Sequence, residues 1–226
     1  MKLIRLNISL LLFFLLVQNF SCQNIGVINS DGTTNNIIEI SNKIDISEDI
    51  EKIKHKMYLT NDFEASTVDN IDQTFYLKFN MYNNEMEFIK ADKVYNLKKI
   101  NGRKVFFKNL NKTYQIFNEN GSLVYFKNFN NNGKAKLLSK QVVKYVKGKT
   151  AASSYQKDKP ADFKKQDDKY FIAIENSIIK LPSKKKSFFE VFENKSSMIK
   201  AFVKSNKINI KKEKDLNKVI NYYNTL

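Results

Sequence analysis

Apolar and polar side chains alternate with a period of two through the middle of this chain, and that period constrains the fold more than any other feature. In the segment 74–90, TFYLKFNMYNNEMEFIK, the apolar residues Phe75, Leu77 and Phe79 alternate with more polar ones. A strand with one buried face has this pattern. The pair Asn83-Asn84 then interrupts it, and asparagine tolerates the positive φ of a tight turn. The segment therefore predicts an antiparallel hairpin.

Turn signals recur at regular intervals along the same stretch. The dipeptides Asn101-Gly102, Asn120-Gly121 and Asn132-Gly133 separate further alternating segments. Their spacing leaves room for hairpins but not for the crossover helices that parallel strands need. We therefore predict an antiparallel meander of about six strands between Gln73 and Val146. Aromatic residues on these strands could line a ligand cavity, although at strand spacing they more commonly fill a core.

The alternation stops after the predicted meander. The segment Lys147–Asp168 gathers small, polar and charged residues around Pro160, which predicts a connecting loop across the surface. In the segment that follows, KYFIAIENSIIKLP, two short apolar runs flank Glu175-Asn176. This arrangement predicts a second hairpin, which Pro182 ends because proline donates no hydrogen bond to a sheet.

After Pro182 the hydrophobic period changes from 2 to 3.6, which indicates helices. Ser187 and Glu190 have the S-x-x-E spacing of a capping box. Two further segments place apolar residues on one helix face: Met198, Ile199, Phe202 and Val203, and then Leu216, Val219, Ile220 and Tyr223. The whole pattern predicts an α+β fold, in which an antiparallel β-meander and a short hairpin precede two or three C-terminal amphipathic helices.

The first residues, MKLIRLNISLLLFFLLVQNFSCQ, have the order of an export signal, with a basic start and then an apolar core from Ile8 to Val17. That core is about half the roughly 20 residues that a membrane-spanning helix needs. We therefore predict an exported protein, located in the periplasm, at the outer membrane surface or outside the cell.

The only cysteine, Cys22, can be interpreted in two ways. Ser21 supplies the small residue that precedes the cysteine of a lipoprotein signal, but Asn19 stands where such signals usually have a branched aliphatic residue. Ordinary cleavage after Cys22 needs small residues before the cut, and Phe20 is too bulky for one of these positions. We favour ordinary cleavage, which removes Cys22, and keep its lipidation as the alternative.

These patterns divide the chain into four parts. Residues 1–22 form the signal peptide, and residues 23–56 form a flexible leader followed by a mixed segment with weak strand and helix character. Residues 57–182 form a β-rich region, and residues 183–226 form a helical region that packs on it. One to two domains are the norm for a chain of this length.

The chain of 226 residues has a formal net charge of +16. Lysine and arginine attract anionic surfaces, including nucleic acids, lipid head groups and acidic glycans. The lysines here are interspersed with acids such as Glu213 and Asp215, a pattern that belongs more commonly to a solvated helix face than to a track for phosphates. Together with the export signal, this favours an anionic lipid, a glycan or an envelope protein as partner, and makes specific nucleic-acid binding the weaker hypothesis.

Residues able to catalyse a reaction are scarce. His55 is the only histidine and lies between two lysines, as a surface residue would. The sequence contains no G-x-S-x-G, H-E-x-x-H or cysteine–histidine pattern. Two carboxylate pairs remain in principle, Asp167 with Asp168 and Glu85 with Glu87, although acids at such spacing usually belong to turns and strand surfaces. The sequence therefore assigns no catalytic residue, no metal ligand and no cofactor.

Four segments of the chain carry a resemblance. They are MYLTNDF (57–63), YLKFNMYNNEMEF (76–88), DDKYFIAIENSIIKLPSKKK (167–186) and KEKDLNKVINYYN (212–224). Together they resemble a group of exported proteins of Bacteroidota-type Gram-negative bacteria, whose members share a signal peptide, a similar hairpin, a lysine-rich stretch and a terminal helix. The segment Ile37–Lys56 has no counterpart. The resemblance implies export and a common fold, and it supplies no catalytic residue because no activity is assigned to the group.

Two hypotheses of function from different classes follow. We favour a non-enzymatic binding or structural module, in the envelope or secreted, that takes an anionic or glycan partner. The alternative is an envelope hydrolase without a recognisable motif, and a nucleic-acid-binding protein is a third and weaker hypothesis.

Overall fold

The computed structural model describes residues 38–40, 48–69, 71–129, 131–152, 155–175 and 177–226. The predicted signal peptide, Cys22 and the leader up to Asn36 lie outside the described residues. The described helices are α1 Glu48–Ile53, α2 Lys185–Glu190, α3 Ser196–Ser205 and α4 Glu213–Tyr223, with the 3₁₀ helices η2 Lys54–Met57 and η3 Glu193–Lys195.

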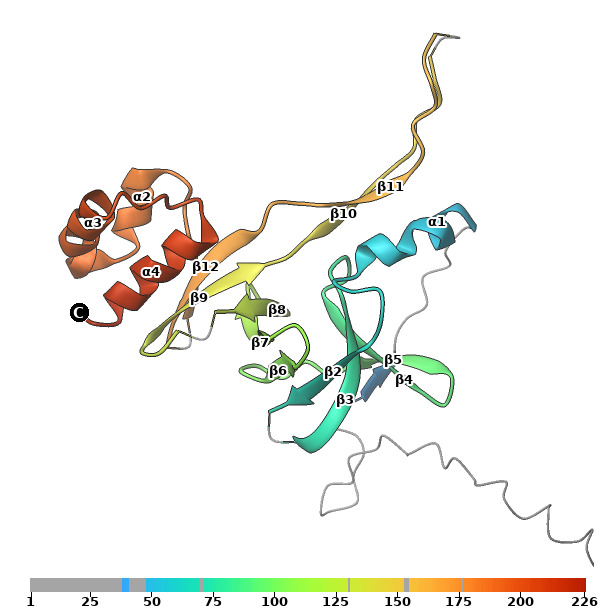
Figure 1. Cartoon of the computed structure of the whole chain (residues 1–226), viewed down its shortest axis with the longest axis horizontal. Coiled ribbons are helices and arrows are strands. Elements are labelled where there is room, and N and C mark those ends of the chain that lie inside the picture. The colour runs from blue at the N-terminus through green and yellow to red at the C-terminus, as the bar shows by residue number, and fades with distance from the viewer. Residues whose placement is uncertain (1–37, 41–47, 70, 130, 153–154, 176) are drawn as a thin grey trace, which may run out of the picture.

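More of the described chain lies in antiparallel strands than in helices (Figure 1). The strands are β1 Ile38–Ile40, β2 Glu64–Val68, β3 Ile71–Asn80, β4 Glu85–Lys90, β5 Lys93–Leu97, β6 Lys104–Phe107, β7 Lys112–Glu119, β8 Ser122–Asn128, β9 Ala135–Lys140, β10 Val143–Val146, β11 Asp162–Lys165, β12 Lys169–Ile174 and β13 Ser177–Lys180. Eleven form one sheet in the order β1-β5-β4-β3-β2-β6-β7-β8-β9-β12-β13, and β10 pairs with β11. The predicted combination of an antiparallel sheet with a few short C-terminal helices is confirmed.

The predicted number of strands is wrong. The sequence predicts about six strands between Gln73 and Val146, whereas the described part of this stretch contains eight, from β3 to β10. The additional strands follow turns that lack a glycine. Ala91 and Asp92 connect β4 to β5 with φ of 48° and 58°, and Asn111 turns the chain between β6 and β7 with φ of 49°. Alanine rarely adopts positive φ, so its presence gave no turn signal.

The strand order departs from a simple meander at β2. This strand lies between β3 and β6, so the connection from β5 to β6 passes β4, β3 and β2. The pairing is antiparallel on both sides: Ser66 of β2 is opposite Phe75 of β3 and opposite Phe107 of β6. The sheet therefore grows in two directions from β2, one half toward β1 and the other toward β13.

The sheet curls around an aromatic centre. Ring centroids place Phe79 of β3 4.8 Å from Tyr114 of β7 and 6.1 Å from Tyr125 of β8. Because β2 and β6 lie between β3 and β7 in the sheet, these rings meet only if the sheet bends back on itself. All three side chains are fully buried. Burial of one large apolar side chain stabilises a fold by about 1.5–3 kcal/mol, so the burial of these rings stabilises the curved form of the sheet.

Asn84, in the turn between β3 and β4, closes the curl. Its Oδ1 accepts a hydrogen bond from Tyr125 N at 2.8 Å, and its Nδ2 donates one to the Tyr125 carbonyl oxygen at 3.0 Å. Strand β8 pairs with β7 along its length but with β9 only at Lys127 and Asn128. The Asn84 amide thus takes the place of a neighbouring strand at Tyr125, where β8 and β9 have diverged.

Strands β9 and β12 are buried on both faces. Neighbouring residues of a strand point to opposite faces, and those of β9 and β12 enter two different hydrophobic clusters. Leu137 and Ile172 belong to the cluster that contains the C-terminal helices. Leu138 and Phe171 belong to a second cluster with residues of β7 and β8. The helices contribute Phe188, Phe192, Ile199, Val203, Leu216, Val219 and Ile220, all buried. They lie together against β9 and β12 in Figure 1.

The predicted capping box is wrong. Helix α2 begins at Lys185, so Ser187 lies inside the helix, and the N-cap residue Lys184 makes no side-chain cap hydrogen bond. The fully buried Phe188 packs 5.3 Å from Phe192, between ring centroids, and such packing stabilises a short helix more than a cap does.

Helix α4 has a carboxylate near its N-terminus. Asp215 Oδ2 accepts a hydrogen bond from Asn209 N at 3.0 Å, which lowers the pKa of the Asp215 carboxyl together with the nearby Lys218. A negative charge in the first turn also suits the helix dipole.

The segment Lys147–Asp168, predicted to be a loop, contains a strand. Within it β11 pairs with β10, and Lys149 pairs with Lys159 further out. The two legs form a ribbon that continues from β9 and β12 and projects from the molecule (Figure 1). Most of this ribbon is exposed on both faces. It therefore lacks the apolar–polar alternation by which a half-buried strand is recognised.

We predict that Ile220→Ala lowers the free energy of unfolding by about 2–5 kcal/mol, because it removes a fully buried side chain from the cluster that joins α4 to β9. Met198→Ala is the control, since Met198 lies on α3 and is 44% exposed. We expect this control to change the free energy by no more than about 0.5 kcal/mol. Chemical denaturation measures both values, and equal losses would contradict the packing of α4 on the sheet.

Candidate functional site

A cleft of about 380 Å³ lies between α4 and the segment that joins β8 to β9. Its lining residues are Phe129, Asn131, Asn132, Asn217, Asn221, Asn224 and Thr225. Five of these seven residues are asparagines, and none of the seven carries a charge. The lining therefore offers hydrogen-bond donors and acceptors without an electrostatic attraction for ions.

Helix α4 supplies two of the asparagines, and its C-cap residue Asn224 is a third at helical spacing. Asn217, Asn221 and Asn224 stand at i, i+4 and i+7, which places them along one face of the helix. Val219 and Ile220 of the same helix are fully buried in the cluster with β9. One side of α4 thus holds the fold, and an adjacent side lines the cleft.

The backbone of β9 fixes the orientation of these amides. Leu137 N donates to Asn131 Oδ1 at 2.8 Å, so the Nδ2 of Asn131 is left to face α4. This nitrogen donates to Asn217 Oδ1 and to Asn221 Oδ1, both at 2.6 Å. The Nδ2 groups of Asn217 and Asn221 donate to no acceptor within the described part of the chain. Each can therefore give two N–H groups to a ligand.

Asn224 joins α4 to the start of β9. Its Oδ1 accepts from Ala135 N, and its Nδ2 donates to the Ala135 carbonyl oxygen, each at 2.8 Å. The side chain also packs closely on Gly133, where a Cβ atom would lie 2.6 Å from Asn224 Cγ. Because Gly133 has φ of +119° as well, both the backbone conformation and the neighbouring side chain require a glycine there.

Lys127 lies beside the aromatic residue of the cleft. Its Nζ is 4.3 Å from the centroid of the Phe129 ring and 3.1 Å from Glu213 Oε1. The ammonium group is attracted to the ring face and paired with the carboxylate. Lysine and glutamate thus balance each other's charge beside the cleft, which keeps its lining neutral.

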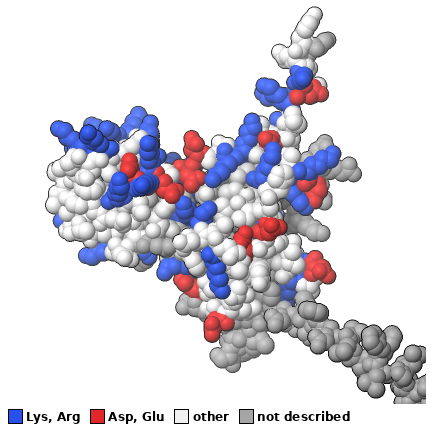
Figure 2. All heavy atoms as spheres, in the orientation of Figure 1, with Lys and Arg blue, Asp and Glu red and all other residues white. Residues whose placement is uncertain are grey.

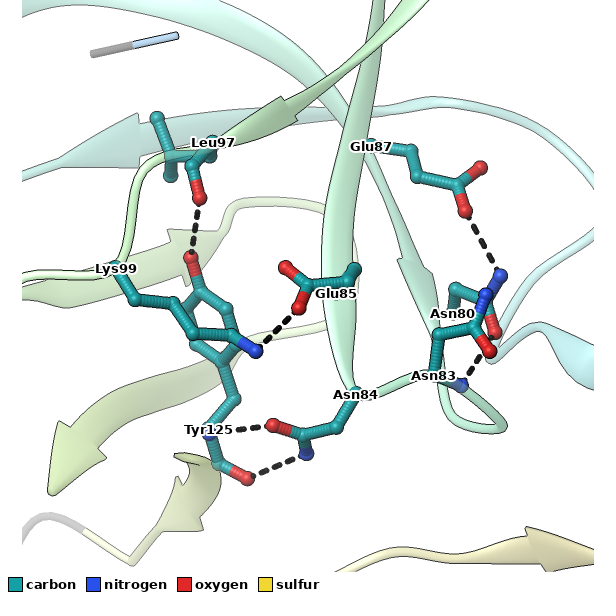
Figure 3. A network of polar contacts seen from close by, with 8 residues as sticks. All are labelled: Asn80, Asn83, Asn84, Glu85, Glu87, Leu97, Lys99 and Tyr125. Atoms are coloured by element: carbon teal, nitrogen blue, oxygen red, sulfur yellow. Dashed lines mark hydrogen bonds and ion pairs between the residues drawn. The ribbon is translucent and has the colours of Figure 1, made fainter. Parts of the chain in front are cut away.

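The predicted carboxylate pair Glu85 and Glu87 has separate structural contacts (Figure 3). Glu85 forms an ion pair with Lys99. Glu87, which is 7% exposed, accepts hydrogen bonds from Asn80 Nδ2 at 2.8 Å and from the Tyr58 hydroxyl at 3.0 Å. Burial, and then the charge of Glu87, raise the pKa of Tyr58. The phenol therefore remains a donor to the carboxylate. These contacts connect Tyr58, the residue after η2, and Asn80 of β3 to β4.

The other sequence candidates are also apart from the cleft lining. Asp167 is exposed, and Asp168 accepts a hydrogen bond from the Ser139 hydroxyl at 3.4 Å. Burial lowers the pKa of Lys112, which interacts with Asp168, and the positive charge of Lys127 lowers it further. His55 is exposed in η2.

The described residues show two further features, which concern metal ions and membranes. They contain no group of three or more His, Cys, Asp or Glu side chains arranged to hold a metal ion. None of the described helices has the length and apolar character that crossing a membrane requires.

No protein-family model, curated protein or solved structure matches this chain. The resemblance to exported proteins of Bacteroidota-type bacteria therefore stays a prediction, and the cleft is interpreted from its own chemistry.

Sequence reasoning did not identify the cleft. The spacing of the apolar residues in the segment 216–223 predicts a helix, and its lysines and acids indicate a solvated outer face. The available signal was the residue type, since Asn217, Asn221 and Asn224 occupy one face of a helix in a region whose commonest exposed residue is lysine. The contribution of Asn131 depends on the fold and had no local signal.

We predict that Gly133→Ala destabilises the protein more than Gly121→Ala does. Gly121 also has positive φ, +89°, but nothing lies within 4 Å of a Cβ built there, so its substitution measures backbone strain of about 1 kcal/mol. Gly133→Ala should lose about 1–3 kcal/mol more, because it displaces Asn224 from its two hydrogen bonds with Ala135.

A double-mutant cycle tests the cause of the extra loss. In an Asn224→Gly background the additional cost of Gly133→Ala should disappear, because the Cβ, Cγ and Oδ1 atoms of Asn224 that the new Cβ would meet are all absent. Fully additive losses, measured by chemical denaturation, would contradict the contact.

Proposed function

We propose that this protein is a non-enzymatic binding module, in the cell envelope or secreted, and that its cleft binds a glycan. The observation that supports the proposal is the gathering of five asparagines around one uncharged cleft. Its volume of about 380 Å³ lies within the range of roughly 300–1,000 Å³ typical of ligand sites.

The chemistry of amides matches that of sugar hydroxyls. An asparagine side chain both donates and accepts hydrogen bonds, as a hydroxyl does, so neighbouring amides can hold neighbouring hydroxyls. Asn217 and Asn221 keep their Nδ2 donors while their Oδ1 atoms are held by Asn131. Phe129 adds an apolar surface, which suits the carbon-bound faces of a sugar ring.

A neutral ligand fits this cleft better than an ion. An anion loses hydration when it is bound and needs a positive partner in return. Lys127, which lies beside Phe129 of the cleft, already pairs with Glu213. The lining side chains also carry no group that exchanges a proton near neutral pH, so the cleft suits binding rather than acid–base catalysis.

The proposal includes export and the finer architecture of the C-terminal part. The basic and apolar order of the N-terminus supports export, with cleavage near Cys22 favoured and its lipidation as the alternative. We propose that α3 and α4 are amphipathic helices packed against β9 and β12, next to the β12–β13 hairpin. Their burial of Ile199 and Val219 and the pairing of β12 with β13 support this arrangement.

We predict that Asn221→Ala weakens glycan binding about 2- to 10-fold, because it removes an amide whose hydrogen bond to the ligand contributes about 0.5–1.5 kcal/mol. Asn221 is exposed, and Asn131 keeps its bond to Asn217, so the fold should be retained. Asn194→Ala is the matched control, since Asn194 is an exposed asparagine of the helical region outside the cleft.

A glycan array identifies the saccharide, and titration calorimetry with that saccharide compares the variants. The proposal requires binding by the native chain and by Asn194→Ala, with a loss in Asn221→Ala and a larger loss in Asn217→Ala/Asn221→Ala. If the array retains nothing, or if Asn221→Ala binds as the control does, the cleft is not a glycan site.

A further inference from the structure

The ribbon formed by β10, β11 and the described residues between them, called the arm below (residues 143–152 and 155–165), is anchored at its base. Phe163 is 6% exposed and packs between Tyr82 and Tyr145, with ring centroids 5.1 and 5.3 Å apart. The Nζ of Lys56, a residue of η2, lies 2.6 Å from Asp162 Oδ1. These contacts fix the direction in which the arm leaves the sheet.

The outer half of the arm is held by its own backbone. Lys149 N donates to the Lys159 carbonyl oxygen, and Lys159 N donates back to that of Lys149, both at 2.8 Å. Ala151 N donates to Asp158 Oδ1 at 2.7 Å. Gly148 lets the two legs approach, because a Cβ there would lie 2.9 Å from the Ala161 nitrogen. The arm is therefore an ordered projection whose outer side chains face solvent (Figures 1 and 2).

The side chains of the arm are strongly biased in charge. Seven lysines and two aspartates occur in residues 143–165, and all seven lysines are exposed: Lys144, Lys147, Lys149, Lys157, Lys159, Lys164 and Lys165. Basic side chains lie along the arm in Figure 2. Such a concentration of positive charge attracts an anionic surface.

Near the outer end of the arm lies a fully exposed aromatic residue. Tyr155 is 101% exposed, and its neighbours in the described chain include the small residues Ala151 and Ala152. A tyrosine ring has an apolar body and a polar tip, which suits the boundary between lipid head groups and acyl chains. Lys157 follows two residues later, at most about 7 Å along an extended chain, within a Debye length of about 8 Å.

We propose that the arm is a membrane-docking element that binds an anionic lipid surface, with Tyr155 in the head-group region and Lys149, Lys157 and Lys159 against the lipid phosphates. A narrow projection with one fully exposed ring, that of Tyr155, offers little area for a complementary protein surface. A fluid bilayer requires no such complementarity, since lipids rearrange around the ring and lysines. This function is independent of the proposed glycan cleft, which lies against α4 and the segment before β9, whereas the arm follows the other end of β9.

Sedimentation with vesicles tests the proposal on the whole chain. Vesicles of phosphatidylcholine with 30% phosphatidylglycerol, a composition of about one anionic lipid in three, are compared with pure phosphatidylcholine. The neutral vesicles measure attachment that is independent of charge, including that of an acyl chain on Cys22. Binding above this level should occur on the anionic vesicles and should fall as salt is raised.

Two triple variants with equal loss of charge locate the contact. The arm variant is Lys149→Ser/Lys157→Ser/Lys159→Ser, and the control is Lys184→Ser/Lys185→Ser/Lys186→Ser at the start of α2. A lysine at an anionic membrane contributes about fivefold in affinity, so the arm variant should bind about 100-fold more weakly. The control should lose less than about fivefold, because it lowers only the net charge. Tyr155→Ser should weaken binding even at high salt, because the loss of its ring is not screened.

Every outcome decides between the arm and its rivals. Equal losses in the two triple variants would show diffuse attraction and overturn the proposal, as would equal binding to neutral and anionic vesicles. Tighter binding of a double-stranded DNA oligonucleotide through the same three lysines and Tyr155 would assign the arm to nucleic acid instead. Unchanged thermal unfolding of the arm variants shows that the losses do not come from misfolding, since the substituted lysines are exposed.

Discussion

The fold depends on one place where strand pairing fails and a side chain replaces it. Ile116 of β7 directs its N–H and carbonyl to Arg103 and Gly102, so the backbone of Tyr125, opposite Ile116, points to the other side of β8. Strand β9 has already diverged there, and two unpaired backbone groups would each cost about 1–3 kcal/mol. The Asn84 amide pairs both groups and joins the β3–β4 turn to β8 (Figure 3).

The divergence of β8 and β9 positions everything that we assign to function. On one side of it the sheet closes around Phe79, and on the other β9 leaves with β12 and β13 as a three-stranded ribbon of the same sheet. The inner part of that ribbon is covered by α2, α3 and α4, and the loop between β8 and β9 faces the asparagines of α4. Its outer part continues into the arm. Two proposed binding surfaces thus sit on one ribbon, with the curled sheet as their support.

The sequence predicted the elements whose signal is local. The alternation around Phe79 and the apolar spacing from Leu216 to Ile220 are properties of single segments, and they indicated the sheet and the helices. The insertion of β2 beside β6, the turn at Ala91 and the role of Asn84 depend on pairings between distant residues, for which one sequence contains no pattern. The arm was mistaken for a loop because exposure on both faces removes the period. The cleft could be predicted only in part, since α4 has its asparagines in sequence while Asn131 reaches them through the fold.

Amide hydrogen exchange of Tyr125 in Asn84→Gly tests the closure most directly. Glycine accepts the φ of 56° at this position, so the substitution removes the amide without adding backbone strain. The account predicts that exchange at Tyr125 N accelerates about 5- to 150-fold, the equivalent of losing about 1–3 kcal/mol of protection, whereas Asn83→Gly in the same turn leaves it nearly unchanged. Exchange at Tyr125 that is equal in the native protein and in Asn84→Gly would contradict the claim that this side chain closes the sheet.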